Sequence, residues 1–138
     1  MFNLPTPARD LVEAFWPGAL TIVVEHAPSL QWDLGNDDGT VAVRMPLHPV
    51  ALEILRETGP MAVSSANKTG QPPADTAEEA RGQLGFTVSV YLEVGELPDR
   101  KPSSLVDCTG EVPQLLRAGA IPLEKLRDVV PSITEPEE

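Results

Sequence analysis

Two arginines lie where an α/β protein can bind an anion. Arg44 ends the apolar run Thr-Val-Ala-Val, and Arg117 ends the run Gln-Leu-Leu. Strand ends are where α/β sheets bind ligands, and a guanidinium there offers a fixed fork of donors to a carboxylate or a phosphate. The same spacing also fits a structural ion pair at a sheet edge. The sequence alone leaves both interpretations open.

Small polar side chains flank two further apolar runs. Ser64-Ser65-Ala66-Asn67 follows Met61-Ala62-Val63 directly, and Ser103-Ser104 precedes Leu105-Val106-Asp107. Hydroxyl and amide groups at such a boundary supply neutral donors to phosphate or carboxylate oxygens. The alternative is a turn in which Ser and Asn cap their own backbone, which is the commoner role of these residue types.

Several other kinds of site lack the residues they need. Lys68-Thr69 has no upstream glycines of a phosphate-binding loop, and the stretch 33–39 has neither the glycine nor the closing Glu of a calcium loop. His26 and His48 have no ligand partners at metal spacing, so we expect no protein-held metal. Cys108 has no nearby base, which indicates a small core residue.

The elements that position these residues alternate between strands and helices. Strands are predicted over residues 19–25, 40–45, 61–65, 87–94, 103–108 and 114–117. Helices are predicted from Pro7 to the stop at 16–18, from Pro49 to Gly59, from Asp75 to Gly85 and from Pro122 onward. Asp75 and Glu78 are expected to form the capping box of the third helix. The pattern predicts an α/β fold with a single open, twisted, mixed sheet and flanking helices.

Composition narrows the function classes. The chain has 138 residues and a net charge of -11, which disfavours binding to a nucleic-acid backbone. It has one cysteine and shows neither a secretory leader nor a membrane-spanning run, so we expect a cytoplasmic protein. Residues 1–130 are expected to form one domain, and residues 131–138 an acidic, disordered tail.

Five segments occur in the order and at the spacing of a known family. They are Phe-Trp-Pro-Gly-Ala-Leu-Thr (15–21), Gly-Thr-Val-Ala-Val-Arg-Met-Pro (39–46) with His48-Pro49, Ser-Ser-Ala-Asn-Lys-Thr-Gly (64–70), Ser-Ser-Leu-Val-Asp (103–107) and Leu-Arg-Ala-Gly (116–119). On these segments the chain resembles the YrdC-like family of threonylcarbamoyl-AMP synthases, in its short form. The resemblance covers nearly the whole chain.

The resemblance implies a nucleotidyltransferase that joins L-threonine, bicarbonate and ATP into threonylcarbamoyl-AMP and releases pyrophosphate. A partner transferase then passes the threonylcarbamoyl group to an adenosine of certain tRNAs, so tRNA is expected only as an indirect partner. ATP is a substrate, and magnesium is expected to shield its triphosphate. By motif match, the expected ATP contacts are Thr40, Ser65, Asn67 and Arg117, and the expected threonine contacts are Arg44, Val63 and Ser103.

The chain departs from the family pattern at its start. It opens on a lone helix without the family's Pro-Thr-Asp-Thr-x-Tyr-Gly segment and Lys-x-Arg pair, so the sheet is expected to be N-terminally incomplete and catalysis impaired. The alternative function is an RNA-binding module of the same fold without catalysis. A third is a carbamoyl-transfer relative inside a larger protein, which the lack of zinc-finger cysteines disfavours.

Overall fold

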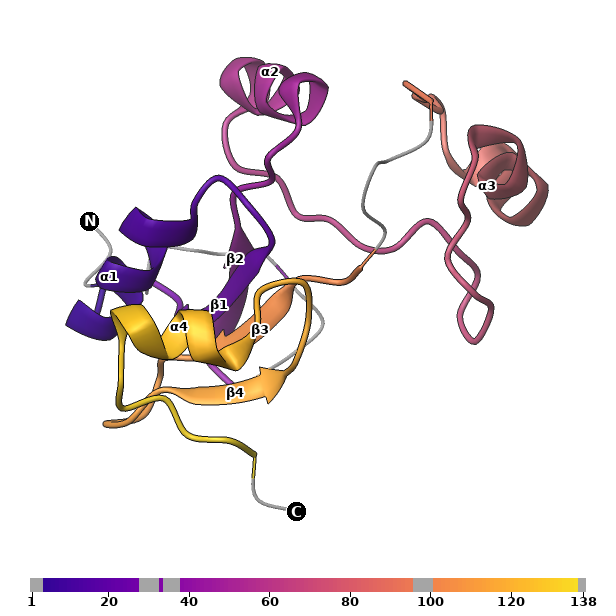
Figure 1. Cartoon of the computed structure of the whole chain (residues 1–138). Coiled ribbons are helices and arrows are strands. Elements are labelled where there is room, and N and C mark those ends of the chain that lie inside the picture. The colour runs from indigo at the N-terminus through magenta and orange to yellow at the C-terminus, as the bar shows by residue number, and fades with distance from the viewer. Residues whose placement is uncertain (1–3, 28–32, 34–37, 96–100, 137–138) are drawn as a thin grey trace. The chain divides into compact units, whose positions relative to one another are not determined.

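The computed structural model describes residues 4–27, 33, 38–95 and 101–136 (Figure 1). The chain divides into two compact units, each described here by itself. The first unit contains Met1–Pro60 and Lys101–Glu138, and the second contains Met61–Arg100. The expectation of one domain over residues 1–130 stays a prediction.

Four strands of the first unit form one sheet in the order β2-β1-β3-β4. Strand β1 (Leu20–Glu25) is antiparallel to β2 (Thr40–Arg44) and parallel to β3 (Ser104–Asp107). Strand β4 (Gln114–Arg117) pairs antiparallel with β3. The β-branched side chains of β1 and β2 favour this extended backbone because they pack well on a pleated surface. The predicted α/β class with an open mixed sheet is confirmed.

Helices α1 (Thr6–Phe15) and α4 (Leu123–Val129) lie side by side over one face of this sheet (Figure 1). Along β1, alternate residues are buried, because successive side chains of a strand point to opposite faces. Complete burial of a leucine such as Leu11 or Leu126 contributes roughly 2 kcal/mol. The core consists of Ala8, Leu11, Leu20, Ile22, Val24, Val106, Cys108, Leu115, Leu126, Val130 and Ile133. The sheet therefore has a covered face against α1 and α4 and a second face on its other side.

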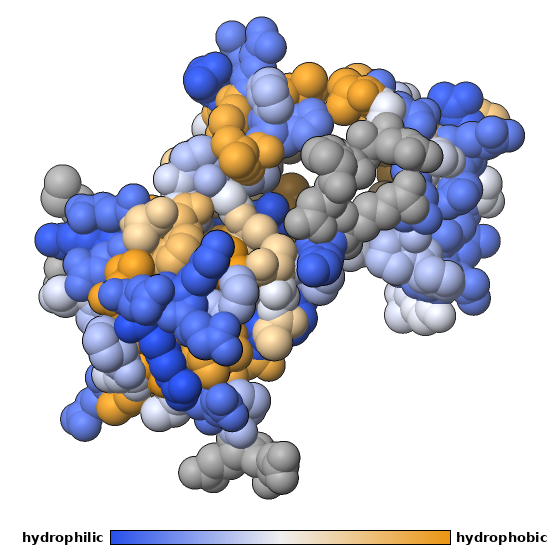
Figure 2. All heavy atoms as spheres, in the orientation of Figure 1, coloured by the Kyte–Doolittle hydropathy of each residue, from blue (hydrophilic) through white to orange (hydrophobic). Residues whose placement is uncertain are grey.

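Helix α2 (Pro49–Thr58) begins and ends as the sequence predicts. The ring nitrogen Nδ1 of His48 accepts a hydrogen bond from the backbone N–H of Ala51 at 3.5 Å. Gly59 follows the helix with a φ of 72°, a conformation that favours glycine. The helix contains no buried residue, and Figure 2 shows apolar, orange atoms at the surface around it. None of the helices described is long and apolar enough to span a membrane.

Helix α3 (Ala77–Leu84) begins one residue later than the predicted capping box. Thr76 is the N-cap, and its hydroxyl accepts from the N–H of Glu79 at 3.1 Å. The Glu79 carboxylate in turn accepts from the N–H of Asp75 at 2.9 Å. The prediction of Asp75 and Glu78 as the box is therefore wrong. The Thr76–Glu79 pair forms the cap because Thr76 satisfies the N–H of Glu79, which the start of a helix leaves unpaired, and Glu79 satisfies the N–H of Asp75 just before the N-cap.

Two predicted strands are absent from the described part of the second unit. Residues 61–65 and 88–94 belong to no strand, and a short 3₁₀ helix, η1 (Gly85–Thr87), occupies the start of the second run. Tyr91 folds back there, and its hydroxyl donates to the Gly85 carbonyl at 2.7 Å. These two predictions are wrong because alternation supplies an apolar face but no hydrogen-bonded neighbour, and a strand needs both.

The beginning of the predicted tail is ordered against β4. Ile133 is 2% exposed and belongs to the core, and Thr134 forms a parallel bridge with Gln114. The N–H of Leu115 donates to the Thr134 carbonyl at 2.8 Å, and the N–H of Thr134 donates to Pro113 at 3.0 Å. Disorder is therefore the wrong prediction for these two residues. Residues 137–138 lie outside the described part.

Candidate functional site

One row of side chains crosses all four strands on the second face of the sheet. Arg44 of β2 pairs with Thr21 of β1, Thr21 pairs with Leu105 of β3, and Leu105 pairs with Arg117 of β4. Directly paired residues share a face, and Thr21 lies between the buried residues Leu20 and Ile22. With strands about 4.8 Å apart, the Cα atoms of the two arginines are separated by roughly 14 Å. A small ligand between them is within reach of both long side chains.

Ser103 fixes the guanidinium of Arg117. Nε of Arg117 donates to the Ser103 carbonyl at 3.0 Å, and Nη2 donates to the Ser103 hydroxyl at 3.0 Å. The Ser103 hydroxyl lies 2.6 Å from that of Thr21, and Ser103 is only 4% exposed. Two bonds to one residue hold the planar group in a single orientation, which leaves its other N–H groups available to an anion.

Close backbone packing holds the segment that contains Ser103 against the segment that contains Arg117. A Cβ on Gly119 would lie 2.5 Å from backbone atoms of Pro102, Ser103 and Ser104, so only glycine fits there. The N–H of Ala120 donates to the Pro102 carbonyl at 3.0 Å. The buried Ser104 hydroxyl donates to the Ile121 carbonyl at 2.6 Å and accepts from the Ile121 N–H at 3.1 Å. The segments 103–107 and 116–119 are thus parts of one site, while Ser104 has a structural role.

The turn before β1 positions Arg44. Nε of Arg44 donates to the Gly18 carbonyl at 3.0 Å, and the N–H of Gly18 donates to the Met45 carbonyl at 2.9 Å. The indole N–H of Trp16 donates to the Leu20 carbonyl at 2.8 Å, which ties the turn to β1. The bond between Trp16 and Pro17 is cis. Neither Arg44 nor Arg117 pairs with a carboxylate in the part of the chain described, so the ion-pair interpretation does not hold there.

Thr40 lies at the opposite end of β2 from Arg44. Four residues at about 3.3 Å each place their Cα atoms roughly 13 Å apart along the strand. The N–H and hydroxyl of Thr40 donate to the Asp38 carboxylate at 3.0 and 2.7 Å, and these bonds hold the pKa of Asp38 below its usual value. Thr40 therefore does not converge with Arg44 on one point, although both belong to the same face.

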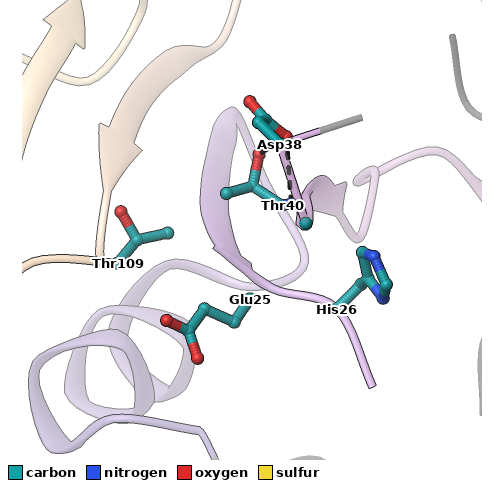
Figure 3. Close-up of a pocket in the computed structure, with 6 residues that line it drawn as sticks. Glu25, His26, Asp38, Thr40 and Thr109 are labelled. Carbon is teal, nitrogen blue, oxygen red and sulfur yellow. Dashed lines mark hydrogen bonds between the residues drawn. The ribbon is translucent and has the colours of Figure 1, made fainter. Parts of the chain in front are cut away.

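A pocket of about 590 Å³ surrounds Thr40 (Figure 3). Glu25 and His26 come from the end of β1, Asp38 and Thr40 from the start of β2, and Thr109 from the turn after β3. Carboxylates, an imidazole and hydroxyl groups line it, and none of its described lining residues is an arginine or a lysine. Within the described residues, no three His, Cys, Asp or Glu side chains are grouped to hold a metal ion.

The remaining predicted contacts belong to the second unit. The N–H of Asn67 donates to the Ser65 carbonyl at 3.0 Å, and the Asn67 side chain donates to the Lys68 carbonyl at 2.8 Å. Asn67 thus caps its own turn, as the alternative interpretation of this segment predicts. Val63 is 87% exposed. Because the two units are described separately, the meeting of these three residues with Arg44, Ser103 and Arg117 stays a prediction.

Sequence reasoning missed Thr21. Its hydroxyl contacts Ser103, yet the predictions place Thr21 in the strand over 19–25 and in the family segment 15–21 without assigning it a contact. A signal was present, since a polar residue between Leu20 and Ile22 must point away from the covered face.

Comparison with known proteins identifies the family. Residues 1–119 match the family model Sua5_yciO_yrdC, described as "Telomere recombination". The chain is 55% identical over 130 residues to a Mycobacterium tuberculosis protein, covering 94% of this chain and 60% of the relative. It is 36% identical over 128 residues to the threonylcarbamoyl-AMP synthase of Bacillus subtilis, covering 91% of this chain and 37% of that one.

Solved structures agree in fold. Pyrococcus abyssi Sua5 in complex with L-threonine matches with a TM-score of 0.89 and 32% identity, over 98% of this chain and 40% of that one. E. coli YciO, at 24% identity and a TM-score of 0.78, covers 90% and 61% and shares the fold. The chain thus spans 60% of the length of the Mycobacterium tuberculosis relative and 37% of that of the Bacillus subtilis relative. By the match over residues 1–119, the chain belongs to the Sua5/YciO/YrdC family.

Proposed function

We propose that this chain is part of a threonylcarbamoyl-AMP synthase, which joins L-threonine, bicarbonate and ATP and releases pyrophosphate. The observation that carries the proposal is the row from Arg44 to Arg117, in which two cations flank the Thr21–Ser103 hydroxyl pair. The reaction requires a carboxylate and a polyphosphate to be held close together. A relative with this fold that binds L-threonine supports the substrate.

The two arginines bind the anionic groups of the two substrates in this proposal. Arg44 binds the threonine carboxylate, and Ser103 donates to the same ligand. Val63 is proposed as a further threonine contact. Arg117 binds the phosphates of ATP, because its guanidinium is already held by Ser103 and needs little ordering on binding.

Thr40 contacts a different part of ATP from Arg117. The pocket around Thr40 contains the carboxylates of Glu25 and Asp38, which repel phosphate but accept hydrogen bonds from ribose hydroxyls. The separation of roughly 13 Å along β2 suits a nucleotide whose phosphates lie toward the row of Arg44 and Arg117 and whose nucleoside lies toward Thr40. Ser65 and Asn67 are proposed as further ATP contacts.

The chemistry needs alignment rather than a protein nucleophile. The amino group of threonine combines with bicarbonate to give a carbamate and a molecule of water. A carbamate oxygen then attacks the α-phosphorus of ATP, and pyrophosphate leaves. Positioning and neutralisation of charge lower such a barrier. Magnesium enters with ATP as its counter-ion. A transferase that modifies tRNA then consumes the product, and we place these steps in the cytoplasm.

Ligand binding by the 138-residue chain tests the proposal. We expect Arg44→Ala to weaken L-threonine binding and Arg117→Ala to weaken ATP binding, each by about 10- to 100-fold, since a charge-assisted bond contributes about 1.5–3 kcal/mol. Isothermal titration calorimetry measures both. Arg9→Ala is the matched control, because Arg9 is an exposed residue of α1, which covers the other face of the sheet.

Three results would contradict the proposal. They are the absence of L-threonine and ATP binding by the unaltered chain, equal losses in Arg9→Ala and the two site variants, and unchanged affinity in both site variants. Circular dichroism of each variant separates loss of the site from loss of the fold. Tight, salt-sensitive tRNA binding would instead favour the RNA-binding alternative.

A further inference from the structure

The hydroxyl of Ser103 forms two hydrogen bonds, and the direction of only one of them is fixed. A guanidinium can only donate, so Ser103 Oγ is the acceptor in its bond with Nη2 of Arg117. Ser103 Oγ also lies 2.6 Å from Thr21 Oγ1, and either hydroxyl can be the donor of that bond. The direction of one proton between Thr21 and Ser103 thus decides what Ser103 can offer to a ligand.

The two directions have different consequences. If Ser103 donates to Thr21, its single proton is used and it can offer a ligand no donor. If Thr21 donates instead, both acceptor positions of Ser103 are filled, by Thr21 and by Arg117, and its own O–H points to a third group.

We infer that Thr21 is a positioning residue for L-threonine: its hydroxyl donates to Ser103 and so directs the Ser103 proton onto an oxygen of the bound ligand. The inference rests on the proposed function, in which Ser103 contacts threonine. Thr21 suits the task because its backbone lies in β1, an inner strand of the sheet that is paired on both sides. Its neighbours in the row, Arg44 and Leu105, offer Ser103 no hydroxyl.

Removal of the Thr21 hydroxyl tests the inference. Thr21→Val keeps the branched shape but not the hydroxyl, and Thr21→Ala is a second variant that avoids any misfit of the valine. We expect both to weaken L-threonine binding about tenfold in calorimetry with the 138-residue chain, the size of effect of one neutral hydrogen bond in a buried network. Thr21→Ser should bind within about twofold of the unaltered chain, because it keeps the donor.

A purely structural role for Thr21 gives a different pattern. ATP affinity should change less than about twofold in Thr21→Val, because the bonds between Arg117 and Ser103 do not involve Thr21. In a Ser103→Ala background, Thr21→Val should have almost no further effect on L-threonine affinity, since residues that act through each other are not additive. Thr58→Val, an exposed Thr of helix α2, controls for the substitution itself.

The outcomes separate this inference from the proposed function. If the unaltered chain binds L-threonine and both hydroxyl-free variants bind it equally well, the inference is wrong while the proposed function stands. Equal losses of ATP and L-threonine affinity, or a full loss in the Ser103→Ala background, would also overturn it. If the unaltered chain binds no L-threonine, both the inference and the proposed function are wrong.

Discussion

Gly119 provides the most direct test of how the site is built. An alanine there would place its Cβ 2.5 Å from the Pro102 oxygen, the Ser103 carbonyl carbon and the Ser104 nitrogen. All three are backbone atoms, so no side-chain rotation relieves the overlap. Relief requires residues 117–121 to move away from residues 102–104.

The magnitude follows from what this movement disrupts. Overpacking by one methyl group in a well-packed site typically costs about 1–3 kcal/mol. The same movement stretches the Ala120 bond to Pro102 and the Arg117 Nε bond to Ser103, each with a net contribution of about 1 kcal/mol. We therefore expect Gly119→Ala to lower the free energy of unfolding by roughly 3–5 kcal/mol.

Urea denaturation followed by circular dichroism measures this change. Gly110→Ala is the matched control, because a Cβ at Gly110 meets only the Val112 oxygen at an ordinary 3.7 Å, and we expect a change within about 0.5 kcal/mol. A Gly119→Ala variant within about 1 kcal/mol of the unaltered chain would refute the reasoning. It would mean that the Ser103 and Arg117 segments are not in close backbone contact.

Two further predictions concern the core. Burial, and secondarily the charge of Asp107, raises the pKa of the Cys108 thiol from 9.0 to about 11, so the folded chain keeps a proton that the unfolded chain loses. Stability should therefore be full below pH 9 and fall as the pH rises toward 11, and Cys108→Ala should remove this part of the pH dependence in urea titrations. Ile133→Ala should lower the free energy of unfolding by about 2–5 kcal/mol. Val112 is half-exposed, so Val112→Ala should lower it by less than about 0.5 kcal/mol. Equal effects of the two substitutions would instead support the prediction of a disordered tail.

The sequence predicts the local elements of the first unit well because their signals are local. The run Leu-Thr-Ile-Val-Val favours a strand in any context, and Pro49 and Gly59 mark the ends of α2 through backbone conformations that depend on few neighbours. The predicted N-cap of α3 is wrong by one residue because Asp75 and Thr76 are both good N-cap residues. Only the geometry of the turn decides between them.

The failures in the second unit have a non-local cause. Residues 61–65 and 87–94 have the composition of strands, but strand pairing is a contact between distant segments, which no window of the sequence contains. Ile133 shows the converse. A single apolar residue among Ser, Thr, Pro and Glu gives no periodic signal, yet the turn after α4 brings it into the core.

Strand direction decides which predicted site residues meet. Strands β2 and β4 both run antiparallel to the β1–β3 pair, so their carboxyl ends lie at the same edge of the sheet. Arg44 and Arg117, each the last residue of its strand, therefore share that edge, and Thr40, the first residue of β2, lies at the other. The sequence marks all three as strand-end residues but carries no sign of direction. Reversal of β4 alone would carry Arg117 to the edge occupied by Glu25 and Thr40, and the two arginines could no longer flank one ligand.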